Sequence, residues 1–425
     1  MNTTKFYGWK LVGVLFLVYF AANAVLLGGN IANTYMSKQA EWSRSFFSLG
    51  FALAYLLVGL ASPLAAGVAK KRGEGFIVST GLIAVCLGCV LMLFMGNVKW
   101  CYILAYGLII GVGCSFATVL PIQTLITRWF QRKRAVATGV VLSAGGIAGL
   151  ISSVLIDKII QSTGKNWIAW LFLAVLTGIA AIVAMFFIKN NPEDLGQVAD
   201  GIEADEKNSN SSQSRNETRV FQTKVPWILK DAMKTPALWI LLLAAVAQFS
   251  TFYLYQNHST ILLMDKGFAN NIAALSQGIL LFASVGGRLL AGVLGDRIEP
   301  RFIMMCGLVM TLAGSLVLLS APGLIFIYVY ASLVGIGFGL VYVCLFTMLG
   351  NYFGTANIRS FLGFMIPIVT LFGAMGPTLG GIIKDKTGNY DMAFIIAIVI
   401  TAVGAFALLF GKPPVKKILT ANERE

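Results

Sequence analysis

IAALSQGILLFASVGGRLLAGVLG, residues 272–295, is an apolar stretch that contains a single charged side chain, Arg288. As an α-helix it would be about 36 Å long, enough to cross the hydrocarbon core of a membrane. Arg288 lies roughly 11 Å of helix rise from the basic end of this stretch, too deep for its charge to reach the membrane surface comfortably. No acidic residue occurs at comparable depth in the chain, which indicates that the partner of this cation is an anionic ligand that binds and leaves.

Eleven further apolar stretches of about 20 residues accompany this one. They begin near Trp9, Phe46, Phe76, Cys101, Ala135, Trp167, Leu238, Phe302, Leu324, Ser360 and Met392. Hydrophobic residues make up 57% of the chain and charged residues 12%, a composition that excludes a water-soluble globule of this length. The sequence therefore predicts an all-α polytopic membrane protein with twelve transmembrane helices, and the even number places both termini on one side.

The basic residues indicate which side that is. When the loops are assigned alternately, 23 of the 32 Lys and Arg residues fall on the side of the termini and 8 on the other side. By the positive-inside rule both termini are predicted to be cytoplasmic, in a multi-pass protein of the cell membrane. The net charge of +14 is then mainly an orientation signal, and no basic domain outside the membrane suggests binding to nucleic acid.

A polar segment divides the twelve stretches into two groups of six. Hydrophobicity collapses between Asn190 and Asp231, which predicts a cytoplasmic linker. The predicted organisation is a six-helix bundle over residues 1–189, the linker over 190–234, a second bundle over 235–411 and a cytoplasmic tail over 412–425. Residues 65–68 (AAGV) match residues 290–293 (LAGV), so the halves are predicted to be pseudo-symmetric, with a site at their interface near mid-membrane.

The loop after this repeated segment carries a related pattern in both halves. It reads Gly67-Val-Ala-Lys-Lys-Arg72-Gly in the first half and Gly292-Val-Leu-Gly-Asp296-Arg297 in the second. The two-half organisation and this Gly-x-x-x-Asp-Arg pattern resemble the major facilitator superfamily, and the resemblance implies a gating role for these loop residues. Lys70 replaces the acid in the first copy, so the resemblance supports a charged gate at the second copy only.

Within that superfamily the chain most resembles the monocarboxylate transporters and their bacterial relatives of the oxalate:formate antiporter group. Three segments carry the resemblance: Phe6-Tyr-Gly-Trp-Lys10, Trp129-Phe-Gln-Arg-Lys-Arg134-Ala-Val-Ala-Thr-Gly139 and Asn191-Pro-Glu-Asp-Leu-Gly196. The family arginine of helix 8 corresponds to Arg288, and Arg134 falls in the motif of helix 5. The resemblance implies a secondary transporter that moves small monocarboxylates, such as lactate or pyruvate, by alternating access with proton symport.

Two departures from these relatives narrow the expectation. Oxalate-type members carry a second cation in the middle of helix 11, where this chain reads Gly363-Phe-Met-Ile-Pro-Ile-Val369. One arginine suits one carboxylate, so a monoanion is favoured over a dianion. Animal monocarboxylate carriers place an aspartate one turn before the helix 8 arginine, whereas this chain has Ser284. Proton coupling must therefore use another group.

His258, the only histidine of the chain, is the candidate for that group because an imidazole titrates near neutral pH. It shares a polar stripe with Tyr255, and a polar stripe on an apolar helix faces the bundle interior. Tyr255, Tyr19, Asn23 and Tyr342 are the predicted substrate-binding partners of Arg288. Polar side chains also hold membrane helices together, so three alternatives stay open: these residues pack helices, His258 bonds a loop, and Arg288 is a structural cation bonded to backbone carbonyls.

The sequence predicts a transporter and not an enzyme. It contains no nucleophile–base pair, phosphate loop or metal cluster, and its six cysteines lie in or beside apolar stretches, where they suit packing. No cofactor or metal is expected, and the expected partners are a small monocarboxylate anion, a proton and the lipid bilayer, with the protein as a monomer. Two alternatives remain, namely an organic anion exchanger of the oxalate–formate type and a membrane metabolite sensor. An exporter of cationic or neutral amphiphiles is disfavoured, because such pockets usually need a buried acid.

Overall fold

The computed structural model describes residues 6–39, 44–95, 98–201, 220–223, 225–320 and 323–415. Eleven helices in these ranges are long and apolar enough to cross a membrane, and a bent pair, Leu49–Leu60 with Ser62–Arg72, supplies a twelfth span. The predicted all-α polytopic fold with twelve spans is therefore confirmed. Much of the predicted linker and most of the predicted tail lie outside the described residues.

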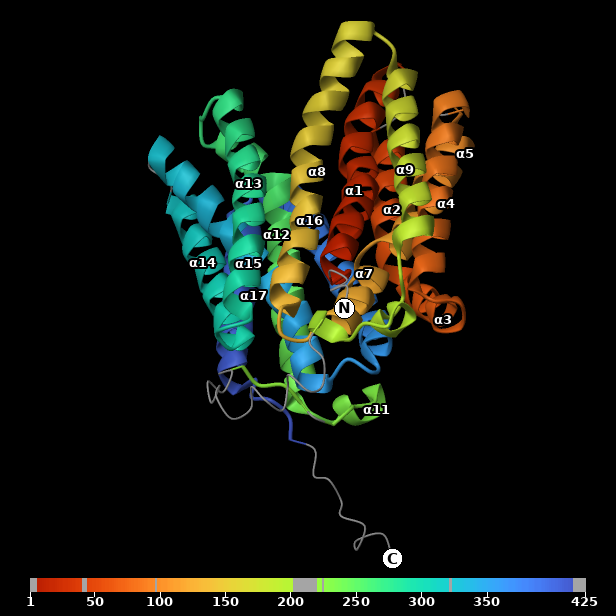
Figure 1. The fold of residues 1–425 in the computed structure, drawn as a ribbon. Coiled ribbons are helices and arrows are strands. Elements are labelled where there is room, and N and C mark those ends of the chain that lie inside the picture. The colour runs from red at the N-terminus through yellow and green to blue at the C-terminus, as the bar shows by residue number, and fades with distance from the viewer. Residues whose placement is uncertain are drawn as a thin grey trace, which may run out of the picture.

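The spans form two bundles that stand side by side (Figure 1). The first half consists of α1 (Gly8–Gln39), α2 (Arg44–Leu60), α3 (Ser62–Arg72), α4 (Glu74–Met95), α5 (Lys99–Tyr102), η1 (Ile103–Ile110), α6 (Gly111–Ala117), α7 (Val119–Trp129), α8 (Arg134–Thr163) and α9 (Asn166–Phe187). The second half consists of α12 (Pro236–Asp265), α13 (Asn270–Gly295), α14 (Pro300–Ser320), α15 (Leu324–Phe353), α16 (Ile358–Thr387) and α17 (Asp391–Phe410).

The described parts of the linker run along one end of the two bundles. They contain the short helices η2 (Pro192–Leu195), η3 (Ala199–Gly201) and α11 (Leu229–Ala232). Asp200 Oδ2 accepts hydrogen bonds from the backbone N–H groups of Gln131 and Arg132, at 3.0 and 2.8 Å. The Thr223 N–H donates to the carbonyl oxygen of Asn351 at 2.8 Å. The linker is therefore bonded to both halves at this end, which we call the linker end.

Two membrane spans of the first half are broken, and a proline follows each break. The helix axis bends by 45° between α2 and α3, where Pro63 occupies the first turn of α3. Thr118, with φ −113° and ψ −125°, separates α6 from α7, and Pro121 follows it. Proline lacks the backbone N–H that would continue the helical ladder, so both breaks follow from the sequence.

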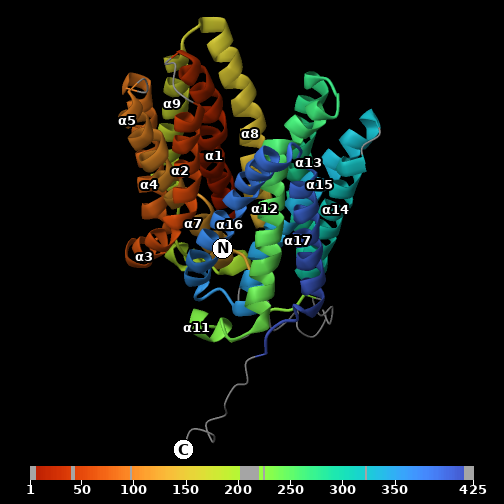
Figure 2. The same cartoon turned by 180° about the vertical axis from the view of Figure 1, so that it is seen from behind.

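The two halves meet through glycines near the linker end. An added Cβ at Gly139 of α8 would lie 2.5 Å from the Arg288 carbonyl oxygen, and one at Gly292 of α13 would lie 3.0 Å from the Ala135 carbonyl oxygen. On the other side of the interface α16 packs against α2 and α3. Figures 1 and 2 show that the halves diverge toward the opposite end. The structure is therefore closed at the linker end.

Gly139→Ala is expected to destabilise this closed contact. The new methyl group would overlap the Arg288 carbonyl oxygen, and overpacking of this kind costs about 1–3 kcal/mol. Gly278→Ala in α13 is the matched control, because nothing lies within 4 Å of its added Cβ and alanine favours helix by up to about 1 kcal/mol. Thermal unfolding of the purified variants should show a lower midpoint for Gly139→Ala and an unchanged or higher midpoint for Gly278→Ala. Equal midpoints would show that the contact is not tight.

Candidate functional site

A cavity lies between the two halves. The space between its lining atoms is about 930 Å³, including the solvent at its mouth. Residues of α1, α2, α3, α6 and α7 line one side, and residues of α12, α15 and α16 line the other. No acidic, basic or histidine side chain is among the described residues that line it. The cavity therefore presents hydroxyl, amide and aromatic groups to a ligand.

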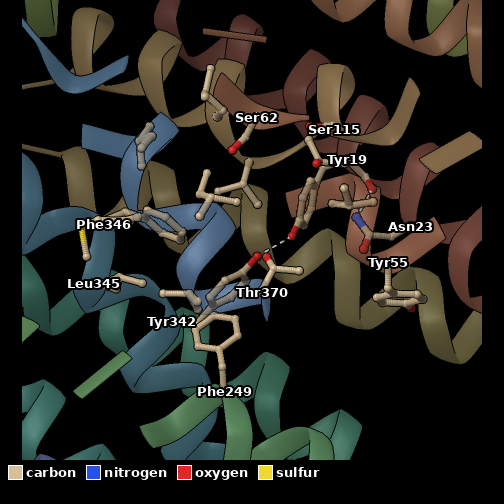
Figure 3. A pocket seen from close by; sticks show the side chains of 18 of the residues that line it. Tyr19, Asn23, Tyr55, Ser62, Ser115, Phe249, Tyr342, Leu345, Phe346 and Thr370 are labelled. Atoms are coloured by element: carbon tan, nitrogen blue, oxygen red, sulfur yellow. Dashed lines mark hydrogen bonds between the residues drawn. The ribbon is translucent and has the colours of Figure 1, made fainter. Parts of the chain in front are cut away.

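Two tyrosines join the halves across this cavity. The hydroxyl groups of Tyr19 on α1 and Tyr342 on α15 form a hydrogen bond of 2.8 Å, which Figure 3 shows as a dashed line. Asn23 also lines the cavity, and its Nδ2 donates to the Tyr19 carbonyl oxygen at 2.8 Å. The structure therefore brings together three of the predicted substrate-binding residues.

Arg288 lies beside this pair but does not line the cavity in the described state. Its side chain is buried, with 7% of the residue exposed, and its Cζ lies 5.1 Å from the ring centroid of Tyr342. Its Nη1 donates to the Leu142 carbonyl oxygen at 2.6 Å. Its Nε–H is buried and has no hydrogen-bond partner among the described residues. A backbone carbonyl thus accepts one hydrogen bond from the Arg288 guanidinium, as expected for a structural cation, while the Nε–H donor stays unpaired.

Small residues of α8 make room for this guanidinium. A Cβ added at Gly145 would lie 3.5 Å from Arg288 Nη1 and 2.8 Å from the ring of Tyr19, and one at Gly146 would lie 3.6 Å from the same nitrogen. Larger side chains at these positions would separate Arg288 from the first half. The cation of α13 is therefore held directly against α8, across the interface between the halves.

Two other predicted residues lie elsewhere in the second half. Tyr255 is fully buried, and its ring packs 4.9 Å from that of Phe394. His258 Nε2 lies 2.8 Å from the Pro377 carbonyl oxygen, and its Nδ1 lies 3.2 Å from the Tyr390 hydroxyl. Because a carbonyl only accepts, Nε2 carries the proton of the neutral ring. The polar stripe faces the interior of its own bundle, so neither residue lines the cavity.

The sequence pattern alone missed several residues that line the cavity. Ser62 is the first residue of α3, and Ser115 lies in the last turn of α6. Tyr55, Phe249 and Tyr253 supply aromatic rings to the same walls. The prolines beside the two helix breaks were the available signal, since proline-interrupted spans often frame the binding site of a transporter.

At the second copy of the loop pattern, Asp296 caps α8 across the interface. Its carboxylate oxygens accept hydrogen bonds from the backbone N–H groups of Ala135 and Val136, at 2.9 and 3.2 Å. A negative charge is favourable at the N-terminus of a helix. Burial nevertheless raises the pKa of Asp296 to about 6, while these N–H donors and the nearby Arg134 oppose the rise. Arg297 is exposed to solvent.

Arg134 makes a second contact between the halves at this end. It is buried, and its Nη1 donates to Asn351 Oδ1 of α15 at 3.0 Å. The residue lies at the start of α8, so the same turn of this helix bonds to both α13 and α15. The motif that contains Arg134, at the start of α8, and the second loop pattern, at the end of α13, therefore meet in one polar cluster at the linker end.

At the first copy the acid is present, but at a displaced position. By its spacing from Gly67, Lys71 and not Lys70 corresponds to Asp296. Lys71 is exposed, whereas Glu74 at the start of α4 is fully buried. Glu74 forms ion pairs with Arg128 of α7, at 2.9 Å, and with Arg359 of α16 in the second half. The first copy therefore also has a buried acid that pairs with both halves, although Glu74 lies outside the loop pattern.

The glycine and arginine of the first copy lie away from this ion-pair group. An added Cβ at Gly67 would meet nothing within 4 Å, so space does not require glycine there. The Arg72 guanidinium carbon lies 4.9 Å from the ring centroid of Phe76, a distance at which a cation and an aromatic face attract. Neither residue contributes to the contact between the halves in the described state.

The fold and site can now be compared with known proteins. The sequence model of the Major Facilitator Superfamily matches residues 11–366 and 272–425 of this chain. This chain belongs to the Major Facilitator Superfamily. It is therefore a multi-pass membrane transporter of that superfamily, in agreement with the resemblance of its two loop patterns.

Several curated relatives of this transporter are named for carboxylate substrates. Monocarboxylate transporter 13 of Rattus norvegicus is 24% identical over 350 residues, or 82% of this chain and 74% of the relative. Monocarboxylate transporter 2 of Homo sapiens is 23% identical over 431 residues, or 99% of this chain and 88% of the relative. The probable sulfoacetate transporter SauU of Cupriavidus necator is 25% identical over 422 residues, or 95% and 93%.

Solved structures support the fold. A single-residue variant of the E. coli fucose:proton symporter FucP aligns with a TM-score of 0.73 and 14% identity, covering 96% of this chain and 100% of that chain. FucP in the outward conformation aligns with a TM-score of 0.70 and 14% identity, covering 96% and 99%. At this identity the likeness concerns the fold alone.

Glu74→Gln is expected to destabilise the closed linker end. The substitution removes the anion that Arg128 and Arg359 share, and deleting one member of a buried ion pair costs about 3 kcal/mol or more. Asp265→Asn is the matched control, since Asp265 pairs with Lys384 in an exposed bridge worth at most about 1 kcal/mol. The thermal unfolding midpoint should fall clearly for Glu74→Gln and little for Asp265→Asn. Similar small shifts would show that the Glu74 cluster does not hold the halves together.

Acidification is expected to stabilise the closed linker end through Asp296. Its pKa is about 6 in the closed contact, compared with about 4 for an aspartate in water. The closed state therefore binds the proton more tightly, so this contribution is fully present below about pH 4 and is lost as pH rises through about 6. The closed fraction can be followed by cross-linking a cysteine pair placed across α8 and α13 in a background without native cysteines. Asp296→Asn should weaken the dependence, since Glu74 is a second buried acid at this end, and a closed fraction that rises with pH would contradict this role.

Proposed function

We propose that this transporter carries small monocarboxylates and that Arg288 binds the carboxylate. The observation that carries the proposal is the buried guanidinium at the interface, which forms no ion pair among the described residues and keeps an unpaired Nε–H. A buried cation is costly unless an anion neutralises it. The names of the monocarboxylate transporters among the relatives support a carboxylate as that anion. Sulfoacetate, for which another relative is named, carries a sulfonate in addition to a carboxylate.

The carboxylate takes the place of the hydrogen bond between Tyr19 and Tyr342. In the described state one phenol donates to the other. A carboxylate placed between them accepts both hydroxyl protons together with the Nε–H of Arg288, and such charge-assisted bonds are the strong ones. Tyr19 belongs to the first half, and Tyr342 and Arg288 belong to the second. The bound anion therefore joins the two halves where the protein alone uses the bond between the two tyrosines.

Transport then proceeds by alternating access. Contacts of Asp296, Arg134 and Glu74 close the linker end, and the opposite end is the one that diverges (Figure 1). The basic residues near the linker end favour its placement in the cytoplasm, with the protein in the cell membrane. An anion that neutralises Arg288 favours the occluded arrangement, which couples movement to occupancy. One chain supplies both walls of the cavity, so we expect a monomer to be functional.

Proton symport would make the cycle electroneutral. No carboxyl or imidazole group is among the described residues that line the cavity, so a proton that accompanies the carboxylate is held elsewhere in the protein. His258 is the candidate carrier, since it bonds to Pro377 inside α16 and Tyr390 before α17. The same lack of a titratable wall also favours a second candidate function, the exchange of one organic anion for another, in which no proton moves.

Uptake of radiolabelled L-lactate into proteoliposomes with an inward proton gradient tests the proposal. Wild type should accumulate lactate. Arg288→Gln should raise the KM for lactate at least about tenfold, because a lost hydrogen bond to a charged group costs about 1.5–3 kcal/mol. Arg288→Lys should be intermediate, because lysine keeps the charge without the planar fork. Arg132→Gln, at an exposed arginine, should transport normally.

The driving force separates symport from exchange. A protonophore should abolish accumulation if a proton accompanies the anion. Uptake that depends on a preloaded organic anion, and not on the gradient, would establish exchange. Normal transport by Arg288→Gln would contradict the assignment of the anion site.

A further inference from the structure

Two serine hydroxyls on the cavity wall are buried and unpaired. Ser62 is 1% exposed and Ser115 is 2% exposed, and neither Oγ has a hydrogen-bond partner among the described residues. Both residues line the cavity and belong to the first half. Figure 3 shows them on the side of Tyr19, across the cavity from Phe249 and Tyr342.

These two hydroxyls are exceptions in the described part of the chain. Every other buried serine or threonine there takes part in a hydrogen bond, most often with a carbonyl oxygen of its own helix. Thr118, three residues after Ser115, donates to the Cys114 carbonyl at 2.7 Å, and Ser79 donates to the Gly75 carbonyl at 2.9 Å. A buried hydroxyl without a partner costs about 1–3 kcal/mol. Two such groups on one cavity point to a ligand that pairs with them.

The helix breaks place these serines at the cavity. Ser62 directly follows the 45° bend between α2 and α3, and Ser115 lies just before the break at Thr118. The two breaks come from different spans of the same half and reach the same wall. A polar pair framed by broken helices is the arrangement in which transporters hold the polar groups of a substrate.

We propose that Ser62 and Ser115 form a second subsite that binds the end of the substrate remote from its carboxylate. The inference rests on the proposed function, in which Arg288 and the tyrosine pair hold the carboxylate. A serine hydroxyl both donates and accepts, so it pairs with a hydroxyl or a carbonyl oxygen. No cation is among the described residues that line the cavity, so a second anionic group would lack a counter-charge. The subsite therefore selects a neutral hydrogen-bonding group at the remote end.

Competition for lactate uptake tests this subsite. The inhibitors are butyrate, 4-hydroxybutyrate and succinate, which differ at the remote end as apolar, neutral polar and anionic. In wild type 4-hydroxybutyrate should inhibit about threefold to tenfold better than butyrate, the effect of one hydrogen bond, and succinate should inhibit worst. In the double variant Ser62→Ala, Ser115→Ala, 4-hydroxybutyrate should inhibit about as well as butyrate, and inhibition by butyrate should be unchanged. Ser79→Ala, at a paired serine outside the cavity wall, should keep the wild-type ratio.

Thermal unfolding of the purified double variant provides a second readout. Removing hydroxyls that lack partners should leave the midpoint unchanged or raise it, whereas a structural role would lower it. A double variant that transports lactate with the wild-type inhibitor ratio, or that unfolds earlier than Ser79→Ala, would overturn the subsite while the carboxylate proposal stands. If wild type takes up no monocarboxylate, either with a proton gradient or with a preloaded organic anion, both the subsite and the carboxylate proposal would be overturned.

Discussion

The cation of Arg288 is held at the interface between two helix bundles, where no carboxylate of the described residues can neutralise it. Much of the surrounding structure depends on this placement. The glycines of α8 admit the guanidinium, the Leu142 carbonyl accepts a hydrogen bond from one of its nitrogens, and its Cζ lies 5.1 Å from the ring centroid of Tyr342. These contacts make the buried charge tolerable while leaving a donor unused. A guanidinium that is only partly satisfied is poised to prefer an anion when one enters.

The linker end holds the two halves together in the described state, and alternating access requires that these contacts also open. Charged and polar groups make the contacts that hold it closed in the described state. Asp296 caps the backbone of α8, and Glu74 bridges two arginines across the halves. The two copies of the loop pattern thus reach one result with acids at different positions. The first copy has Lys71 where the second has Asp296, and its buried acid is Glu74, three residues further along the chain.

Local composition explains why much of this could be predicted from the sequence. Apolar length predicted the spans, the polar segment predicted the two halves, and the lone charge within a span singled out Arg288. What could not be predicted depends on contacts between distant segments. Glu74 lies outside the loop pattern, so the pattern did not predict its ion pairs. The polar stripe of Tyr255 and His258 predicted a position inside the protein, but not whether it faces the cavity or the interior of its own bundle. The unpaired state of Ser62 and Ser115 is visible only when every possible partner has been placed.

Ligand-induced stabilisation of the purified protein tests most directly whether the site binds an anion through Arg288. L-lactate and L-lactamide have similar shapes, but only lactate carries a negative charge. The thermal unfolding midpoint of wild type should rise with lactate and stay constant with lactamide, and that of Arg288→Gln should respond to neither, because binding to the folded state raises its stability by mass action. Equal stabilisation by both ligands, or an undiminished response to lactate in Arg288→Gln, would contradict the central role given to this cation.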